Sequence, residues 1–248
     1  MRVLILGGTT EARAMGQALA DAKLDGIMSL AGRVERPLSQ PLPQRLGGFG
    51  GVEGLRAYLR EHAITHVIDS THPFAAQMTR NALAACKAES VPYLALTRAP
   101  WIAEAGDNWQ HVPDIAGAVA ALAGPPRRVM LAIGRQNLTA FAIQPQHFYL
   151  LRLVDPPETP LPLPHTHVIV DRGPFTQEAD KALMQDHQID LVVSKNAGGT
   201  GARAKLDAAR ALGLPVVMID RPALPARAEV HEVAAALAWL HGAIPRGV

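Results

Sequence analysis

Asp69 and His72 are the titratable side chains that the sequence places best for proton transfer. Both belong to the segment Asp69-Ser70-Thr71-His72-Pro73-Phe74, which follows a short apolar run. Histidine is the side chain best suited to move a proton near neutral pH, so we predict that this pair is catalytic. Asp followed by Ser-Thr is also typical of a helix cap, and a structural role for both residues stays open.

A glycine turn near the start of the chain is suited to phosphate groups. Residues Gly7-Gly8-Thr9-Thr10-Glu11-Ala12 follow the apolar run Val3 to Leu6 and precede a helix-forming stretch. They partly match G-x-G-x-x-G/A, with Gly7 first, Thr9 in the middle and Ala12 at the small third position. Helix amides and a threonine hydroxyl would then receive a pyrophosphate. The alternative is a plain turn between a strand and a helix.

The second strand-like stretch bears on which dinucleotide fits. NAD-specific sites usually have an acidic residue about twenty residues after the glycine turn, where it binds the ribose 2′-hydroxyl. Here that stretch is Met28-Ser29-Leu30-Ala31-Gly32-Arg33, which offers a hydroxyl and a guanidinium instead. Since an Arg fork matches a phosphate, Ser29, Gly32 and Arg33 predict NADPH, with Arg36 as a second candidate. Arg33 as a mere loop charge is the alternative. Thr71 completes the predicted cofactor set.

A second glycine-rich turn, Ser194 to Gly201, predicts a receptor for an anionic group. It follows an apolar run and precedes a helix-forming stretch, and it offers hydroxyl, amide and lysine donors. Further cationic and aromatic residues follow other predicted strands. The predicted substrate-binding set is Arg98, Trp101, Arg135, Arg172, Lys195, Asn196, Gly199, Thr200 and Lys205. A structural turn with solvated lysines is the alternative.

Other motifs disfavour several functions. Gly47-Gly48-Phe49-Gly50-Gly51 suits an anion-binding nest and a hinge equally well. His165 and His167 lack a third ligand, so we predict no metal. The absence of a G-x-S-x-G elbow and of Walker A spacing disfavours hydrolases and nucleoside triphosphatases. Cys86 is the single cysteine, which excludes an intrachain disulfide.

The composition is that of a soluble globular protein. The chain has 248 residues, of which 48% are hydrophobic and 19% charged, and its net charge is +2. Its basic residues form no run, so we expect no nucleic acid. The mildly basic balance suits an anionic small ligand, and an arginine-rich composition that reflects genome bias is the alternative. No apolar run approaches the ~18 residues of a membrane span, and the apolar start is too short for a secretory signal. We therefore expect a cytoplasmic protein without a membrane partner.

Predicted strands and helices alternate along the chain. The predicted strands are 2–6, 27–30, 66–69, 93–97, 109–112, 129–133, 149–154, 167–170, 190–194 and 215–219. The predicted helices are 11–20, 52–62, 73–89, 114–123, a short one near 138, 176–187, 202–212 and 230–240, with a long loop over 33–51. Such alternation is typical of parallel sheets with right-handed crossovers.

The predicted fold class is α/β, with two doubly wound Rossmann-like domains whose parallel sheets face a cleft. Gly124-Pro125-Pro126-Arg127 interrupts the alternation, so we place the boundary there. Residues 1–124 would form the NADPH-binding domain, and residues 125–248 would complete the substrate cleft. Ligands of such folds lie at the carboxyl ends of the strands, where the candidate residues lie.

The sequence resembles the precorrin-6A reductase family over essentially its whole length. These motifs carry the resemblance, in the order seen in that family: Leu6-Gly7-Gly8-Thr9-Thr10-Glu11-Ala12-Arg13, Ala31-Gly32-Arg33, Gly47 to Gly51, Asp69-Ser70-Thr71-His72-Pro73-Phe74-Ala75, Arg98-Ala99-Pro100-Trp101, Lys195-Asn196-Ala197-Gly198-Gly199 and Arg221-Pro222. The run through His72-Pro73-Phe74-Ala75 is the specific one. Some relatives have Ser in place of Ala197, and the loop from Pro156 to Pro164 matches no motif.

The resemblance implies a reductase of cobalamin biosynthesis with two Rossmann-like domains. Such an enzyme reduces one carbon–carbon double bond of precorrin-6A with NADPH and gives precorrin-6B. Its partners would be an anionic tetrapyrrole and, through channelling contacts, neighbouring enzymes of the pathway. The proton donor is not fixed by the resemblance. A nucleotide-sugar glycosyltransferase and a non-catalytic NADP-binding regulator are the alternatives.

Overall fold

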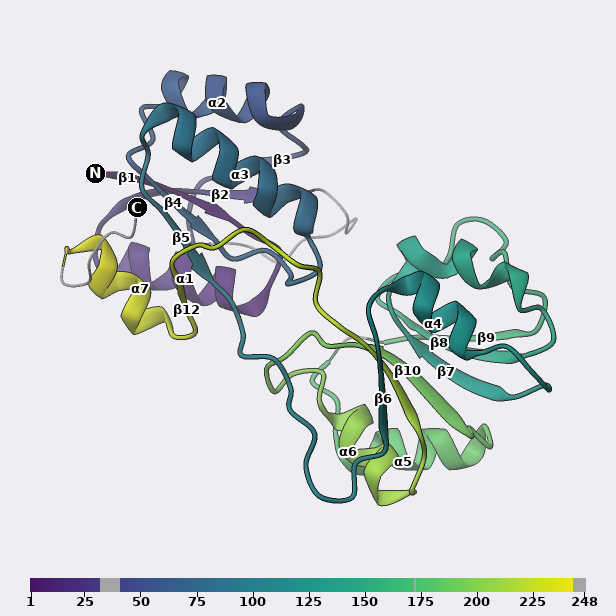
Figure 1. Ribbon diagram of the computed structural model, residues 1–248. Helices are drawn as coiled ribbons and strands as arrows, with labels where there is room; N and C mark the ends of the chain where they lie inside the picture. Colours follow the sequence, from purple (N-terminus) through teal and green to yellow (C-terminus); the bar gives the residue numbers. More distant parts are fainter. Residues whose placement is uncertain (32–40, 172, 243–248) are drawn as a thin grey trace. The chain divides into compact units, whose positions relative to one another are not determined.

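The computed structural model describes residues 1–31, 41–171 and 173–242, and the chain divides into two compact units (Figure 1). Unit 1 combines Met1–Arg98 with the segment that begins at Ala223, and unit 2 is Ala99–Pro222. Each unit has its own sheet of parallel strands with helices on both faces. The predicted fold class of two doubly wound α/β domains is confirmed.

The elements of unit 1 are β1 Arg2–Leu6, α1 Thr10–Asp21, β2 Asp25–Leu30, β3 Gln44–Leu46, α2 Gly51–Glu61, β4 His66–Asp69, α3 Ala76–Glu89, β5 Tyr93–Leu96, β12 Glu229–Val230 and α7 Val233–Leu240. The elements of unit 2 are β6 Trp109–Val112, α4 Ile115–Ala121, β7 Arg128–Ala132, the 3-10 helix η1 Arg135–Ile143, β8 Phe148–Leu153, β9 Thr166–Val170, α5 Gln177–Asp186, β10 Leu191–Lys195, α6 Ala204–Ala211 and β11 Val216–Ile219.

The sheet of unit 1 has the order β12-β5-β4-β1-β2-β3. Alternate side chains of the central strand β1 enter two different cores, because successive side chains of a strand point to opposite faces. Val3 and Ile5 pack in the core that includes residues of α1 and α7, whereas Leu4 and Leu6 pack in the core that includes residues of α2 and α3. This two-sided burial explains why β1 is an uninterrupted apolar run.

The sheet of unit 2 has the order β6-β11-β10-β7-β8-β9. Met130, Leu150 and Val192 from three neighbouring strands share one core with residues of α5 and α6. Figure 1 shows α4 on the other face, where it packs against β11 and η1. All strand pairs of both sheets are parallel, so within each unit the strand carboxyl ends meet at one edge, here called its carboxyl edge.

The chain divides elsewhere than at the predicted boundary after residue 124. Strand β6 pairs with β11, with Val216 beside Trp109, so the segment from Ala99 belongs to unit 2. Strand β12 pairs with β5, and α7 packs against α1, so the end of the chain returns to unit 1. Gly124-Pro125-Pro126 is a turn inside unit 2, between α4 and β7.

Several element ends also differ from the sequence prediction. Helix α3 begins at Ala76 rather than Pro73, because residues 72–75 form a turn in which the Ala75 amide donates to the His72 carbonyl at 2.7 Å. Strand β3 lies in the stretch predicted as a loop. The last helix begins at Val233, because residues 229–230 form β12.

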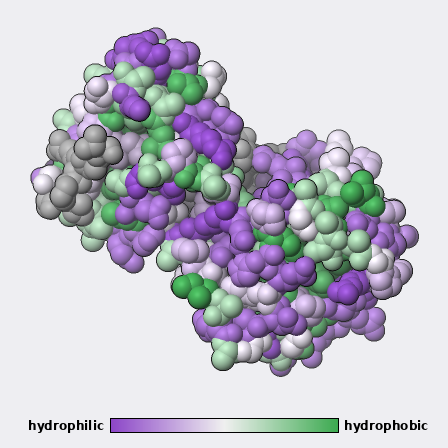
Figure 2. Space-filling view, in the orientation of Figure 1, coloured by the Kyte–Doolittle hydropathy of each residue, from purple (hydrophilic) through white to green (hydrophobic). Residues whose placement is uncertain are grey.

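In the part of the chain that the structure describes, no helix combines the length and the apolar character that a bilayer span requires. Figure 2 shows hydrophobic residues scattered among hydrophilic ones on the visible face. The exposed large hydrophobic residues are Met1, Leu46, Ile102, Ile143, Val154 and Val170.

Candidate functional site

The turn after β1 is tied to the turn after β4. Thr9 caps α1: its Oγ1 accepts the Ala12 amide proton at 3.1 Å and donates to the Ser70 carbonyl at 2.8 Å. The Thr9 hydroxyl is thus committed to the protein, whereas Thr10 is exposed. The first-turn amides of Thr10 and Glu11 have no intrahelical acceptor, as at any helix start. They and the helix dipole make this turn suitable for a pyrophosphate.

Gly7 and Gly8 of this turn lie in different surroundings. A Cβ added to Gly7 would lie 2.5 Å from the Met28 Sδ, so any larger residue there would have to displace the Met28 side chain. Gly8 has a φ of 116°, and a Cβ added there meets nothing within 4 Å. The space above Gly8 is therefore open to a ligand, and a phosphate could approach the backbone closely.

Glu11, in the first turn of α1, is neutralised by Arg98. The Arg98 Nε lies 2.8 Å from the Glu11 Oε2, and both side chains are largely buried. Arg98 follows β5 in unit 1, and its guanidinium contacts the predicted cofactor turn. This ion pair removes a negative charge that would otherwise repel a phosphate at the helix start.

Ser29, near the end of β2, contacts an arginine that the sequence analysis missed. The Arg45 Nη1 on β3 donates to the Ser29 Oγ at 3.1 Å, and the Ser29 carbonyl accepts the Gly7 amide proton at 2.8 Å. Arg45 also stacks on Phe49, with its Cζ 3.8 Å from the ring centroid. The signal that could have found it is a lone cation between the prolines and glycines of the predicted loop.

Asp69 is an anchor inside unit 1. Its Oδ1 accepts from the Thr71 amide at 3.0 Å and from the Thr71 Oγ1 at 2.7 Å. Its Oδ2 accepts from the Thr79 Oγ1 at 2.7 Å and from the Tyr93 hydroxyl at 2.8 Å. Only 4% of Asp69 is exposed. Four donated hydrogen bonds thus fix the Asp69 carboxylate beside the turn that carries His72, and its predicted part in proton transfer stays a prediction. The Thr71 hydroxyl therefore donates its proton to Asp69.

The Asp69 carboxylate also perturbs its neighbours. Burial raises the pKa of the Tyr93 hydroxyl far above its usual value, and the negative charge and hydrogen bond of Asp69 raise it further. Burial, followed by the charge of Asp69, raises the pKa of the Cys86 thiol to about 12. Both groups therefore stay protonated at neutral pH, and Cys86 is an inert core residue.

His72 is half-buried in the turn after β4. Its Nδ1 accepts the amide proton of Phe74 at 3.2 Å. Because Nδ1 is an acceptor, the neutral ring carries its proton on Nε2. The geometry thus presents a single N–H donor on this imidazole.

In unit 2, contacts join four predicted substrate ligands into one cluster: Trp101, Asn196, Gly199 and Lys205. The Asn196 Oδ1 accepts the Trp101 amide proton at 2.8 Å, and the Asn196 Nδ2 donates to the Trp101 carbonyl at 2.9 Å. The Trp101 Nε1 donates to the Gly199 carbonyl at 2.6 Å. Beneath the Trp101 ring lies the Lys205 Nζ, 5.0 Å from the centroid, which donates to the Ala202 carbonyl at 2.5 Å.

This cluster differs from the predicted direct contact with a substrate. Asn196 and Trp101 are each 6% exposed and Lys205 is 8% exposed. Their polar groups bond to the protein, because the turn after β10 must be fastened to the segment around Trp101. Burial lowers the pKa of the Lys205 ammonium to about 8, although the Asp180 carboxylate opposes the shift.

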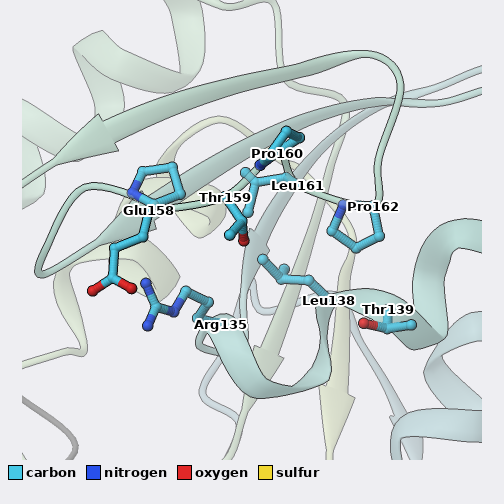
Figure 3. A pocket seen from close by; sticks show the side chains of 9 residues that line it. Arg135, Leu138, Thr139, Glu158, Thr159, Pro160, Leu161 and Pro162 are labelled. Carbon is cyan, nitrogen blue, oxygen red and sulfur yellow. The ribbon is translucent and has the colours of Figure 1, made fainter.

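The remaining predicted ligands of unit 2 lie nearer to solvent. Lys195, at the end of β10, is half-buried, and Thr200 is exposed. Arg135, exposed at the start of η1, lines a pocket of about 230 Å³ with the Pro-rich loop after β8. Figure 3 shows the Arg135 guanidinium pointing toward Glu158 across this pocket. The predicted residues Gly32, Arg33, Arg36 and Arg172 lie outside the described residues.

Comparison with known proteins bears on the family. Residues 2–241 match the family model described as Precorrin-6x reductase CbiJ/CobK. The precorrin-6A reductase of Rhodobacter capsulatus is 57% identical over 249 residues, which span 100% of this chain and 99% of that protein. The precorrin-6A reductase of Rhodococcus erythropolis is 46% identical over 241 residues, which span 96% of this chain and 97% of that protein.

A solved structure described as CobK precorrin-6A reductase has a TM-score of 0.94 and 57% identity, and the match covers 100% of both chains. These matches agree with the resemblance on which the sequence analysis drew. The chain belongs to the precorrin-6x reductase family.

Proposed function

We propose that this protein reduces one carbon–carbon double bond of precorrin-6A with NADPH and gives precorrin-6B on the route to cobalamin. Family membership supports the reaction and the substrate. The observation that carries the cofactor assignment is the turn after β1. It has open space at Gly8 and first-turn helix amides without an intrahelical acceptor, and its Gly7 amide donates to the Ser29 carbonyl. Within this proposal the enzyme works in the cytoplasm, beside the enzymes that supply and consume its substrate.

The carboxyl edge of unit 1 would hold the dinucleotide. The backbone of Gly8, Thr10 and Glu11 would bind the pyrophosphate, and Ser29 would contact the adenosine ribose. NADPH supplies the hydride when it is bound. The protein contributes orientation, because hydride transfer requires donor and acceptor carbons within roughly 3 to 3.5 Å.

His72 is the group that we assign to proton delivery. The reduction adds a hydride to one carbon of the double bond and a proton to its neighbour. Since Nδ1 accepts from Phe74, the proton that the neutral ring would transfer is the one on Nε2. Asp69 acts as a positioning residue, since its hydrogen bonds join Thr71, in the turn on which His72 lies, to Thr79 on α3 and Tyr93 on β5.

The acidic arms of the macrocycle would bind to the cationic and hydroxyl groups at the carboxyl edge of unit 2. In the described part of unit 2, the side chains of the predicted set that are not buried are those of Lys195, Thr200 and Arg135. Trp101, Asn196 and Lys205 support them from the interior by fixing the turn after β10. A precorrin carries several carboxylates, which suits such donors.

The test of the function is anaerobic oxidation of NADPH with and without precorrin-6A, with NADH as the control cofactor. We expect substrate-dependent oxidation that favours NADPH, and precorrin-6B as the product by mass. Tight NADPH binding without turnover would instead support a non-catalytic regulator. Binding of neither nucleotide would contradict the reductase proposal.

The role of His72 is tested by His72→Ala. Loss of a positioned proton donor should lower kcat by roughly 10² to 10⁴, while the Kd for NADPH changes less than about threefold because the cofactor turn is intact. His241→Ala, at an exposed position after α7, is the matched control and should keep wild-type turnover. Full turnover by His72→Ala would remove His72 from this role.

A further inference from the structure

Arg45 is the cation that the structure places beside the carboxyl end of β2. Strands β2 and β3 pair in parallel with Ser29 opposite Arg45, and the Arg45 Nη1 donates to the Ser29 Oγ. The same serine is bonded through its carbonyl to Gly7 in the turn after β1. Adjacent strands lie about 4.8 Å apart. Strand β3 is therefore two strand spacings from β1, and the Arg45 guanidinium reaches Ser29 on the strand between them.

The protein holds this guanidinium in a fixed orientation. The Nη1 also donates to the Gly47 carbonyl at 2.7 Å, and the Nη2 donates to the Gly48 carbonyl at 2.9 Å. The group lies flat on Phe49, and its Cζ is 5.2 Å from the Tyr58 ring centroid. These contacts preorganise the fork and still leave N–H groups for another acceptor.

The charge of Arg45 is not compensated by these partners. Among the described residues, its three hydrogen-bond acceptors are a hydroxyl and two carbonyls, all of them neutral oxygens. Ser29 is 6% exposed and accepts from Arg45, so its own hydroxyl proton is available to a further acceptor. A guanidinium and a hydroxyl donor side by side suit an anion, and above all a phosphate.

We propose that Arg45, together with Ser29, binds the 2′-phosphate of the adenosine ribose and selects NADPH over NADH. The inference rests on the proposed function, in which the dinucleotide lies on the carboxyl edge of unit 1. It assigns the cation that recognises the phosphate to β3, whereas the sequence predicted Ser29 together with Arg33 or Arg36, which follow β2. NADH has a hydroxyl in place of the 2′-phosphate, so the guanidinium would add little to its binding affinity.

Equilibrium binding of NADPH and NADH to the whole protein, measured by calorimetry, tests the proposal. Arg45→Ala should raise the Kd for NADPH about 10- to 100-fold, the usual effect of losing a charged hydrogen bond. The Kd for NADH should change less than about threefold. Arg60→Ala is the matched control, because it removes the same charge from the opposite end of α2, where Glu89 keeps Arg56 as a partner.

Arg45→Ala also removes the hydrogen bonds to the Gly47 and Gly48 carbonyls, so a second variant is needed that keeps Arg45. Ser29→Asp keeps Arg45 in place through an ion pair but puts a negative charge where the phosphate would bind. We expect NADPH affinity to fall at least tenfold and NADH affinity to hold or rise.

Two results would overturn the inference alone. One is that Arg45→Ala weakens the binding of NADPH and of NADH by the same factor. The other is that the ratio of the Kd for NADPH to the Kd for NADH stays at the wild-type value in both variants. Both results leave the reductase proposal intact if the wild type oxidises NADPH in the presence of substrate. Failure of the wild-type protein to bind either nucleotide would overturn the proposed function and the inference together.

Discussion

Lys205 is a buried ammonium whose charge costs stability at neutral pH. It lies under Trp101 and faces Asp180 and Arg152, which form an ion pair with each other. Burial lowers its folded-state pKa to about 8, below the unfolded value of 10.5. Between these two values the unfolded chain binds more protons than the folded one, so stability rises with pH in this window.

Lys205→Met should therefore differ from the wild type in a pH-dependent way. The cost of the buried charge is fully present below pH 8, so the variant should be relatively most stable there. From pH 8 toward 10.5 the free energy of unfolding of the wild type should rise relative to that of the variant by about 2–3 kcal/mol, because of the difference between the folded and unfolded pKa values. The measurement is the free energy of unfolding in urea at intervals from pH 7 to pH 10.

The difference between the two proteins is the quantity to follow, because Tyr93 and Cys86 titrate with the opposite sign in the same range. Burial raises both of their pKa values, so each lowers stability as pH rises. Lys87→Met, at an exposed position on α3, is the control and should parallel the wild type. A gap between Lys205→Met and the wild type that is constant with pH would contradict a buried charge at Lys205.

At the scale of single residues, the sequence predicts which segments matter better than it predicts what each side chain does. Ser29 could be selected because it ends an apolar run, whereas its partner Arg45 lies in a three-residue strand that no periodicity marks. Asp69 ends a predicted strand, Asn196 follows one, and Lys205 lies in the predicted helix after the same turn. Whether such a side chain points outward or into the core depends on packing that local sequence does not encode.

The turn between β10 and α6 depends on glycine at one position and not at another. Gly198 has a φ of 69°, and a Cβ there would lie 2.2 Å from the Ala99 carbonyl oxygen. Gly198→Ala should lower the free energy of unfolding on the order of 2–4 kcal/mol, through backbone strain and the clash. Gly201, where a Cβ meets nothing within 4 Å, is the control.

Urea unfolding of both alanine variants tests this dependence. Gly201→Ala should stay within about 0.5 kcal/mol of the wild type. Since the turn also carries Lys195 and Thr200, Gly198→Ala should weaken precorrin-6A binding as well. Equal stability of the two variants would show that the close approach of Ala99 and Gly198 is not needed for folding.

At the scale of elements, strands buried on both faces are the ones that sequence predicts well. Strands β1, β7, β10 and β11 each contain at least three consecutive apolar residues, because helices cover both sides of each sheet. The two short edge strands β3 and β12 were missed, since two or three residues carry no periodic signal. The start of α3 was misplaced because Pro73 favours a first helical turn but lies here in the preceding turn.

At the scale of the whole molecule, the alternation of strands and helices predicts two parallel sheets but not which strands share a sheet. Gly124-Pro125-Pro126 is the strongest break in the sequence, yet it joins α4 to β7 within unit 2. The chain passes from one unit to the other near residues 98 and 222. These two segments include Pro100 and Pro222, but neither has a comparable run of consecutive glycine and proline residues. Pairing of β6 with β11 is a long-range contact, which local composition does not reveal.

This division predicts which fragment of the chain folds alone. Residues 99–222 form a continuous unit with a complete sheet, so that fragment should unfold cooperatively in urea and show native-like circular dichroism. Residues 125–248 lack β6 and α4, which leaves β11 uncovered, and they include α7 without its partner α1. That fragment should be unfolded or aggregate, because Trp239 and Leu240 would lose their core. Cooperative unfolding of 125–248 but not of 99–222 would contradict the division and favour a boundary at residue 124.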